Sequence, residues 1–284
     1  MDLKMGVSSL LWTENFGVQD ITKFEKVKNI GFDCFEICVA DPFDFPVDEV
    51  RKAAEDAGIG LTTISVALDD RNPVSPEKAV RDKAVEFLKK MVDINLGIGS
   101  KIIGGPNYAA WGYITGTSRT DDEWKWAADT IRQAGEYAKQ QGDLVIALEP
   151  INRFETYFIN IAQDAVDFAN EVGLDNVGVH LDTFHMIREE TGIAEAVKTC
   201  GDKLFYVHVC ENNRGIPGTG LTPWKEFFTA IKDVGYDGTL TIESFDPNFE
   251  EINRNCAIWR KFAENGEQLA TEGLNNLKAI ASEI

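Results

Sequence analysis

Short apolar runs and longer amphipathic stretches alternate along the whole chain. The runs have the length and composition of strands that are buried on both faces, as the strands of a parallel sheet are. They occupy residues 3–8, 34–39, 61–66, 101–103, 144–149, 177–182, 204–209 and 239–243. The pattern therefore predicts eight β-strands, each followed by a segment with helical periodicity.

The stretches between these runs carry the start and stop signals of helices. We expect helices at residues 20–29, 47–57, 76–95, 121–141, 162–172, 193–199 and 223–234, with Ser75 as the N-cap of the third. From about residue 249 to residue 284 the pattern is again helical, with a break near Gly266. This last segment is longer than one outer helix needs to be.

Eight strand and helix repeats are the number found in a (β/α)8 TIM barrel, a fold of roughly 250 residues. A doubly wound open sheet would show the same alternation, but the eight repeats favour the barrel. No linker or low-complexity stretch divides the 284 residues. We therefore predict a single α/β domain over residues 1–284, a TIM barrel with an extended C-terminal helical segment.

Each of the last four strands ends in a polar side chain that can bind a metal or transfer a proton. Glu149, Asp182, His208 and Glu243 end the fifth to eighth strands, about one strand and helix unit apart. In a closed barrel these ends meet at one mouth, where three carboxylates without a cation would repel one another. Three oxygen donors and one imidazole suit Mn²⁺, Co²⁺ or Mg²⁺ better than a structural zinc. The spacing predicts a shared metal site.

The alternation of side chains along a strand predicts which residues lie beneath this site. Val145 and Ala147 should point inward below Glu149, and His180, Tyr206 and Thr241 should point inward below Asp182, His208 and Glu243. We expect His180 to be an interior, hydrogen-bonded histidine rather than a ligand. For Glu36, in the second strand, we expect a local hydrogen bond.

Two long loops follow strands and should line the mouth. Residues 104–120 are rich in glycine and aromatics, and we expect Tyr108, Trp111 and Tyr113 to be exposed and to cover a small polar ligand. Residues 212–222 are rich in glycine and carry Arg214. Together with Glu155 and His185, Arg214 offers donors and acceptors suited to sugar hydroxyls, whereas Arg153 could simply pair with a neighbouring acid.

The charge balance argues against nucleic acids and anionic membranes as partners. Lysine and arginine total 28 and aspartate and glutamate total 47, which gives a net charge of −19. The N-terminal residues lack the apolar core of a signal peptide, and no run reaches transmembrane length. The five cysteines form no CxxC motif and are interpreted as reduced thiols of a cytoplasmic protein.

Several segments resemble the ketose 3-epimerases, the D-tagatose 3-epimerase and D-allulose (D-psicose) 3-epimerase family of the sugar isomerase/epimerase barrels. They are LEPINRFE, LDTFHM, HVCENNRGIPGTG and TIESF, together with MGVSSLLWT near the N-terminus and the loop GGPNYAAWG. The similarity extends over the whole chain. One departure is HMIREE, where relatives often have HMNIEE, so that Ile187 replaces an asparagine.

The resemblance implies a metal-dependent enzyme that inverts C3 of free ketoses such as D-tagatose and D-fructose or D-allulose. By motif, Glu149, Asp182, His208 and Glu243 would bind Mn²⁺ or Co²⁺, and Glu149 and Glu243 would also be the catalytic acid/base pair. Glu155, His185, Arg214, Trp111 and Trp12 would bind the substrate. Relatives form dimers and tetramers, so a homodimer or homotetramer is expected.

The chemistry needs such a pair of carboxylates. Removal of the proton on C3, next to the ketone, leaves a cis-enediolate that a cation stabilises. One carboxylate must remove the proton from one face and the other must return a proton on the opposite face. Glu149 and Glu243, at the ends of the fifth and eighth strands, could flank the sugar in this way.

Three alternatives remain open from the sequence. An aldose-ketose isomerase of the same superfamily would use the same metal and carboxylates to move a carbonyl between C1 and C2. A nuclease of the endonuclease IV type would need more than the three histidines of this chain, His180, His185 and His208, and a basic face. A non-catalytic sugar-binding protein would not need paired carboxylates.

Overall fold

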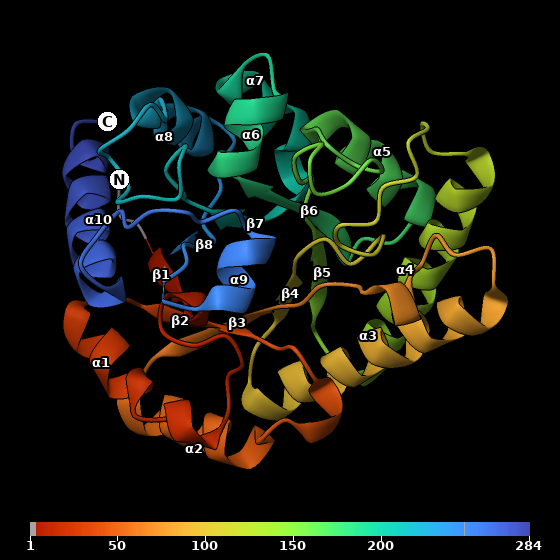
Figure 1. The fold of residues 1–284 in the computed structure, drawn as a ribbon, viewed down its shortest axis with the longest axis horizontal. Coiled ribbons are helices and arrows are strands. Elements are labelled where there is room, and N and C mark those ends of the chain that lie inside the picture. The colour runs from red at the N-terminus through yellow and green to blue at the C-terminus, as the bar shows by residue number, and fades with distance from the viewer. Residues whose placement is uncertain (1–3, 247) are drawn as a thin grey trace.

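The computed structural model describes residues 4–246 and 248–284. Within these residues, eight parallel strands form a closed barrel in chain order, with β8 pairing to β1 (Figure 1). The strands are β1 (Lys4–Ser8), β2 (Cys34–Cys38), β3 (Gly60–Ile64), β4 (Ile102–Gly104), β5 (Val145–Leu148), β6 (Val177–Asp182), β7 (Leu204–His208) and β8 (Thr239–Ile242). The predicted TIM barrel is confirmed, and only Leu3 of the predicted first strand lies outside the described residues.

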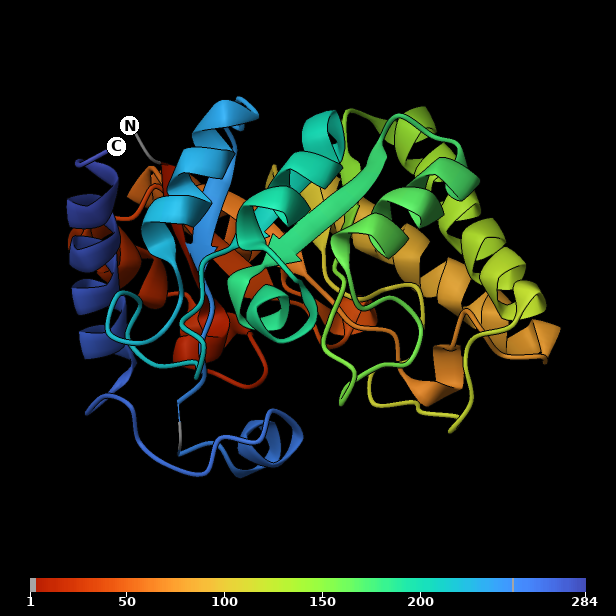
Figure 2. The same ribbon diagram turned by 90° about the horizontal axis from the view of Figure 1, so that it is seen from above.

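The α-helices of the described residues lie around the strands, most of them in an outer ring (Figures 1 and 2). They are α1 (Lys23–Ile30), α2 (Val47–Ala57), α3 (Lys78–Ile98), α4 (Asp121–Gln141), α5 (Ala162–Val172), α6 (Thr183–Glu189), α7 (Ile193–Cys200), α8 (Trp224–Asp233), α9 (Glu250–Asn255) and α10 (Gly266–Ala281). Sequence signals fix their ends. Thr120 and Glu123 form a reciprocal capping box at the start of α4, and Gly58, in the left-handed region at φ 61°, ends α2.

Helix α1 begins at Lys23 and α8 at Trp224, three residues and one residue later than expected, and two further helix starts also differ from the expectation. Helix α3 begins at Lys78 with Glu77 as its N-cap, so the predicted cap at Ser75 is wrong. The hydroxyl of Ser75 instead accepts a hydrogen bond from the Glu77 N–H, two residues on, in a local turn. Helix α6 was not predicted. It starts directly at the end of β6, because the Asp182 carboxylate accepts a hydrogen bond from the Phe184 N–H at 2.7 Å.

The C-terminal segment divides near the predicted break. Helix α9 is followed by a stretch without helix, and α10 begins at Gly266 with the Asn265 side chain as its cap. In Figure 1, α9 lies in front of the strands, and in Figure 2 it lies on the same side as the loops that follow the strands. It therefore partly covers the mouth of the barrel.

The packing of β5 and β7 shows which of their side chains point into the barrel. Ala147 and Tyr206 belong to a small cluster inside the barrel with Leu10 and Ile64, whereas Ile146 and Leu148 belong to the larger core between barrel and helices. Across neighbouring strands, His180 is paired with Tyr206, and Asp182 with His208. The predicted inward positions of Ala147 and Tyr206 are thus confirmed.

All five cysteines are free thiols. Among the helices of the described residues, none is both long and apolar enough to span a membrane.

Candidate metal centre and active site

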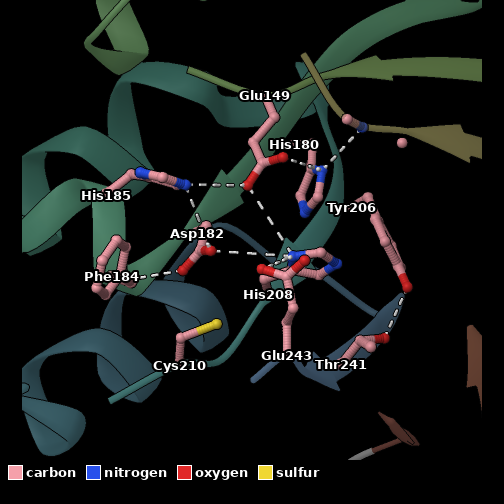
Figure 3. A network of polar contacts seen from close by, with 12 residues as sticks. Glu149, His180, Asp182, Phe184, His185, Tyr206, His208, Cys210, Thr241 and Glu243 are labelled. Atoms are coloured by element: carbon pink, nitrogen blue, oxygen red, sulfur yellow. Dashed lines mark hydrogen bonds and ion pairs between the residues drawn. The ribbon is translucent and has the colours of Figure 1, made fainter. Parts of the chain in front are cut away.

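Four buried side chains from consecutive strands converge at the mouth of the barrel (Figure 3). They are the predicted set, Glu149, Asp182, His208 and Glu243, and one possible ligand atom from each lies within 4.8 Å of the others. Asp182 and His208 are fully buried, and Glu149 and Glu243 are 6% and 7% exposed. Each follows or ends its strand, so the closed barrel itself brings them together.

The Nδ1 atom of His208 faces the carboxylates and has no hydrogen-bond partner among the described residues. It lies 3.3 Å from Glu243 Oε2, 3.9 Å from Asp182 Oδ2 and 4.0 Å from Glu149 Oε1. A buried polar atom without a partner is costly, and a divalent cation between these atoms would satisfy it. The chemistry of the donor set therefore suits a divalent metal.

Glu36 reaches the same histidine from the other side. Its Oε2 lies 2.7 Å from His208 Nε2 and accepts a hydrogen bond from the Tyr206 hydroxyl, also at 2.7 Å. The expected local hydrogen bond of Glu36 is therefore wrong. The side chain points into the barrel interior, where its partners come from β7.

His180 is fully buried, as predicted. Its Nδ1 accepts a hydrogen bond from the Gly105 N–H at 3.3 Å and lies 3.7 Å from Glu149 Oε2. Burial lowers the pKa of His180 well below its ordinary value, so the ring is neutral. Geometry also allows Glu149, His180 and His208 to share a metal, but the four-residue set brings more carboxylate oxygens to the cation.

The two glutamates lie in different electrostatic surroundings. Burial raises the pKa of Glu149 well above its ordinary value, and the Glu243 and Asp182 carboxylates add to the rise. Burial alone would also raise the pKa of Glu243, but the Arg214 guanidinium and His208 outweigh it and hold that pKa well below its ordinary value. The pKa values of the two glutamates thus differ because only Glu243 contacts the Arg214 guanidinium directly.

Arg214 is the cation at this site. Its Nη1 donates to Asp182 Oδ2 at 2.7 Å and lies 2.8 Å from Glu243 Oε2. Its guanidinium also lies over the ring of Phe184, 4.0 Å from the centroid. The residue lies in the loop after β7 and adopts a left-handed backbone conformation with φ 62°.

A cavity of about 270 Å³ opens beside the four-residue cluster. Glu149, Glu243 and the predicted substrate residues Glu155, His185, Arg214 and Trp111 all line it. The Trp111 indole donates from Nε1 to Glu155 Oε2 at 2.8 Å. His185 accepts from the Asn152 N–H at Nδ1, 3.1 Å away, and its Nε2 lies 3.4 Å from Arg214 Nη2 and 3.7 Å from Glu149 Oε1.

One predicted aromatic position differs from expectation, and another lies away from the cavity lining. Tyr108 is fully buried rather than exposed, and its hydroxyl donates to the Glu149 and Ile159 carbonyls at 2.8 and 3.1 Å. It therefore fixes the backbone at the end of β5 instead of covering a ligand. Trp12 packs its ring edge-on against Phe35 and is not among the described residues that line the cavity.

Several residues in and around the cavity were not predicted from the sequence. Phe184 forms part of the wall, and Ile252 and Cys256 contribute from the C-terminal segment. Asn152, which is not part of the lining, bridges the lining residues Glu155 and His185. Asn152 lies between Glu149 and Glu155 in the motif, so its position was a usable signal. Ile252 and Cys256 carry no such signal, because they reach the cavity only through the path of the chain over the mouth.

Arg153 pairs with a neighbouring acid, which was the simpler of its two interpretations. Its guanidinium forms a two-pronged ion pair with Glu189 of α6, with Nη2 2.7 Å from Oε2. The pair holds the loop after β5 against α6 and does not involve the cavity.

Comparison with known proteins gives a consistent family. Residues 24–280 match the family model described as "Xylose isomerase-like TIM barrel". The chain is 33% identical to D-psicose 3-epimerase of Ruminiclostridium cellulolyticum, covering 94% of this chain and 92% of the relative. It is 31% identical to L-ribulose 3-epimerase of Mesorhizobium japonicum, with 94% and 90% covered.

A solved structure of a similar protein superposes over nearly the full length. It is D-allulose 3-epimerase of Methylomonas sp. in complex with D-allulose, with a TM-score of 0.93, 28% identity, and 98% of this chain and 96% of that chain covered. The barrel, the buried cluster and these relatives lead to one conclusion: this chain is an enzyme of the ketose 3-epimerase family, within the xylose isomerase-like TIM barrels.

Proposed function

We propose that this enzyme inverts the configuration at C3 of free ketoses, with Glu149 and Glu243 as its acid and base. The supporting observation is that both carboxylates line one cavity and approach the same His208 Nδ1 from the ends of β5 and β8. A sugar bound beside them would have a carboxylate near each face of C3. One group then removes the C3 proton and the other returns a proton to the opposite face.

Glu149, Asp182, His208 and Glu243 would hold the metal, which we propose to be Mn²⁺ or Co²⁺, with Mg²⁺ also compatible with the donor set. When bound, the cation acts as a Lewis acid that stabilises negative charge on the substrate oxygens next to C3. The protein's own residues keep the site dry, because all four are almost fully buried. Dry surroundings strengthen the electrostatic interactions on which proton abstraction depends.

The O1 to O3 end of the sugar would be held by Glu155, His185 and Arg214, with Trp111 and Trp12 completing the binding residues. Arg214 offers donors, His185 offers its Nε2, and Glu155 offers an acceptor already oriented by Trp111 and Asn152. Trp12 packs against Phe35 and does not line the cavity among the described residues, so its contact with the substrate would require a shift of the surrounding loops.

The substrate class follows from the charge of the cavity. Among the described residues that line it, Arg214 is the one permanent cation, and it is already paired with Asp182 and Glu243. Nothing there would neutralise a phosphate, so we infer a free ketose. The similar enzymes named for D-psicose, L-ribulose and D-allulose motivate D-fructose, D-allulose and D-tagatose as the first sugars to test.

The test is a panel of ketohexoses incubated with the Mn²⁺-loaded protein and separated by chromatography. Formation of the C3 epimer from at least one ketose is the expected result. Formation of an aldose instead would favour the second candidate, a metal-dependent aldose-ketose isomerase, which the same cluster of carboxylates could serve. Light scattering on the same sample would show whether the enzyme is the homodimer or homotetramer that we expect.

A further inference from the structure

Glu36 is a buried acid that the proposed reaction does not use. It lies on β2, in register with Ser8 of β1 and Thr62 of β3, and none of its surface is exposed. Its Oε2 contacts His208 Nε2 and the Tyr206 hydroxyl, and its Oε1 has no hydrogen-bond partner among the described residues. Burying a carboxylate with one oxygen that accepts no hydrogen bond costs free energy of folding. We therefore expect Glu36 to have a role beside His208.

The contact with Glu36 decides which nitrogen of His208 carries the proton. The Tyr206 hydroxyl donates to Oε2, and an ionised carboxylate can only accept hydrogen bonds. At 2.7 Å, His208 Nε2 must therefore present an N–H to Glu36. A histidine that binds a metal must be neutral, and in that form the lone pair of the ring is left on Nδ1, which faces Glu149, Asp182 and Glu243.

We propose that Glu36 is a positioning residue for the metal centre. It fixes the tautomer and the ring orientation of His208 and makes its Nδ1 a better electron donor toward a divalent cation, without touching the cation or the substrate itself. Carboxylates in this place behind a histidine ligand raise the metal affinity of a site by roughly 10- to 100-fold. The inference rests on the proposed function, because it requires the metal at the four-residue cluster.

A purely structural role is the competing explanation. Tyr206 links Glu36 to Thr62 and Thr241 through hydroxyl contacts of 2.8 and 2.7 Å, and Thr62 in turn contacts Cys34. Glu36 could thus merely complete a polar network in the barrel interior. The variant Tyr206→Phe separates the two explanations, because it removes these hydroxyl contacts and leaves the Glu36–His208 contact in place.

The experiment is calorimetric titration of Mn²⁺ into the apo forms of the wild type, Glu36→Gln and Tyr206→Phe. We expect Kd to rise by about 10- to 100-fold in Glu36→Gln and to stay within about threefold in Tyr206→Phe. Equal affinity of Glu36→Gln and the wild type, or an equal loss in both variants, would overturn the inference. Failure of the wild type to bind Mn²⁺ would overturn the metal centre itself and, with it, this role of Glu36.

A second measurement on the wild type keeps the inference testable if Glu36→Gln does not fold. The measurement is NMR of the Mg²⁺-loaded protein labelled with ¹⁵N-histidine. Comparison with the variants His180→Asn and His185→Gln assigns the resonances of His208. These resonances should show a slowly exchanging proton on Nε2 and none on Nδ1. A proton on Nδ1, or no protected proton on Nε2, would refute the role of Glu36.

Discussion

Arg214 Nη1 lies 2.8 Å from Glu243 Oε2, so one of the two proposed proton-transfer residues is neutralised by the protein's own cation. Glu149 has no such close contact with a guanidinium, and its pKa is shifted in the opposite direction. The pair is therefore chemically unequal in the metal-free protein. This asymmetry suits a reaction in which one carboxylate removes a proton while the other supplies one.

Replacing either carboxylate by its amide should stop turnover. Glu149→Gln and Glu243→Gln each lose a group that can take up a proton, and we expect kcat to fall by at least about 10³-fold. Circular dichroism should show that both variants keep the fold. Glu189→Gln is the matched control, because Glu189 pairs with Arg153 and does not line the cavity. Substantial kcat in either amide variant would remove that residue from the proton-transfer role.

Removal of Arg214 should make the protein depend on metal for stability. In Arg214→Ala, the buried Asp182 and Glu243 lose their shared cation, which should lower the free energy of unfolding of the apo protein by about 3 kcal/mol. Mn²⁺ should then raise Tm more in this variant than in the wild type, because it supplies the missing positive charge. Thermal melts with and without Mn²⁺ check this, and an equal rise in Tm in both proteins would argue against the account.

The loop that carries Arg214 is held by the carboxylate of Glu211. Its oxygens accept hydrogen bonds from the backbone N–H groups of Asn212, Gly218 and Thr222 and from the Trp224 indole, at 2.9, 3.0, 2.9 and 3.2 Å. Burial opposes the charge, but these bonds outweigh it and lower the pKa of Glu211 below its ordinary value of 4.5. The charged form is therefore the one that the folded loop favours.

A carboxyl whose pKa is lowered by folding contributes stability above its unfolded pKa and loses it as pH falls through the folded pKa. The loop should thus loosen only below about pH 4.5, whereas Glu211→Gln should loosen it at neutral pH and raise KM. Hydrogen exchange of residues 212–222 measures this. Glu226→Gln, on the exposed face of α8, is the control, and unchanged exchange in Glu211→Gln would contradict the role of Glu211 in the loop.

Chelation should inactivate the enzyme reversibly. Dialysis against EDTA removes the cation that offsets three buried carboxylates, so activity and Tm should both fall and should return when Mn²⁺ is added. At a free Mn²⁺ concentration about 100 times Kd, the gain in the free energy of unfolding should be about 2.7 kcal/mol. Full activity after exhaustive chelation would exclude the metal mechanism.

The sequence carried enough information for the barrel and for the four converging groups. Strands buried on both faces read as short apolar runs, and the polar residue that ends each run must lie at the mouth once the barrel closes. Glu149, Asp182, His208 and Glu243 are recognisable for this reason. Their convergence depends only on strand order, which the repeat pattern supplies.

Contacts between distant segments could not be predicted from local sequence patterns. Glu36 was given a local partner, but its actual partners lie 170 and 172 residues further along the chain. Tyr108 was expected at the surface because of its glycine-rich loop, yet its hydroxyl satisfies two buried carbonyls. For Glu36 and Tyr108, tertiary packing overrides the local signal. Helix α6 was not predicted because it begins at Thr183, directly after the last residue of β6, with no loop between them.

Incorporation of solvent deuterium tests the central claim most directly. The enzyme is incubated in D₂O with Mn²⁺ and a ketohexose that it converts, and the label is located by NMR. If Glu149 and Glu243 remove and return a proton at C3, deuterium should enter C3 as the epimer forms, and the ketone should stay at C2. Deuterium at C1, together with an aldose product, would contradict C3 epimerisation and identify an isomerase.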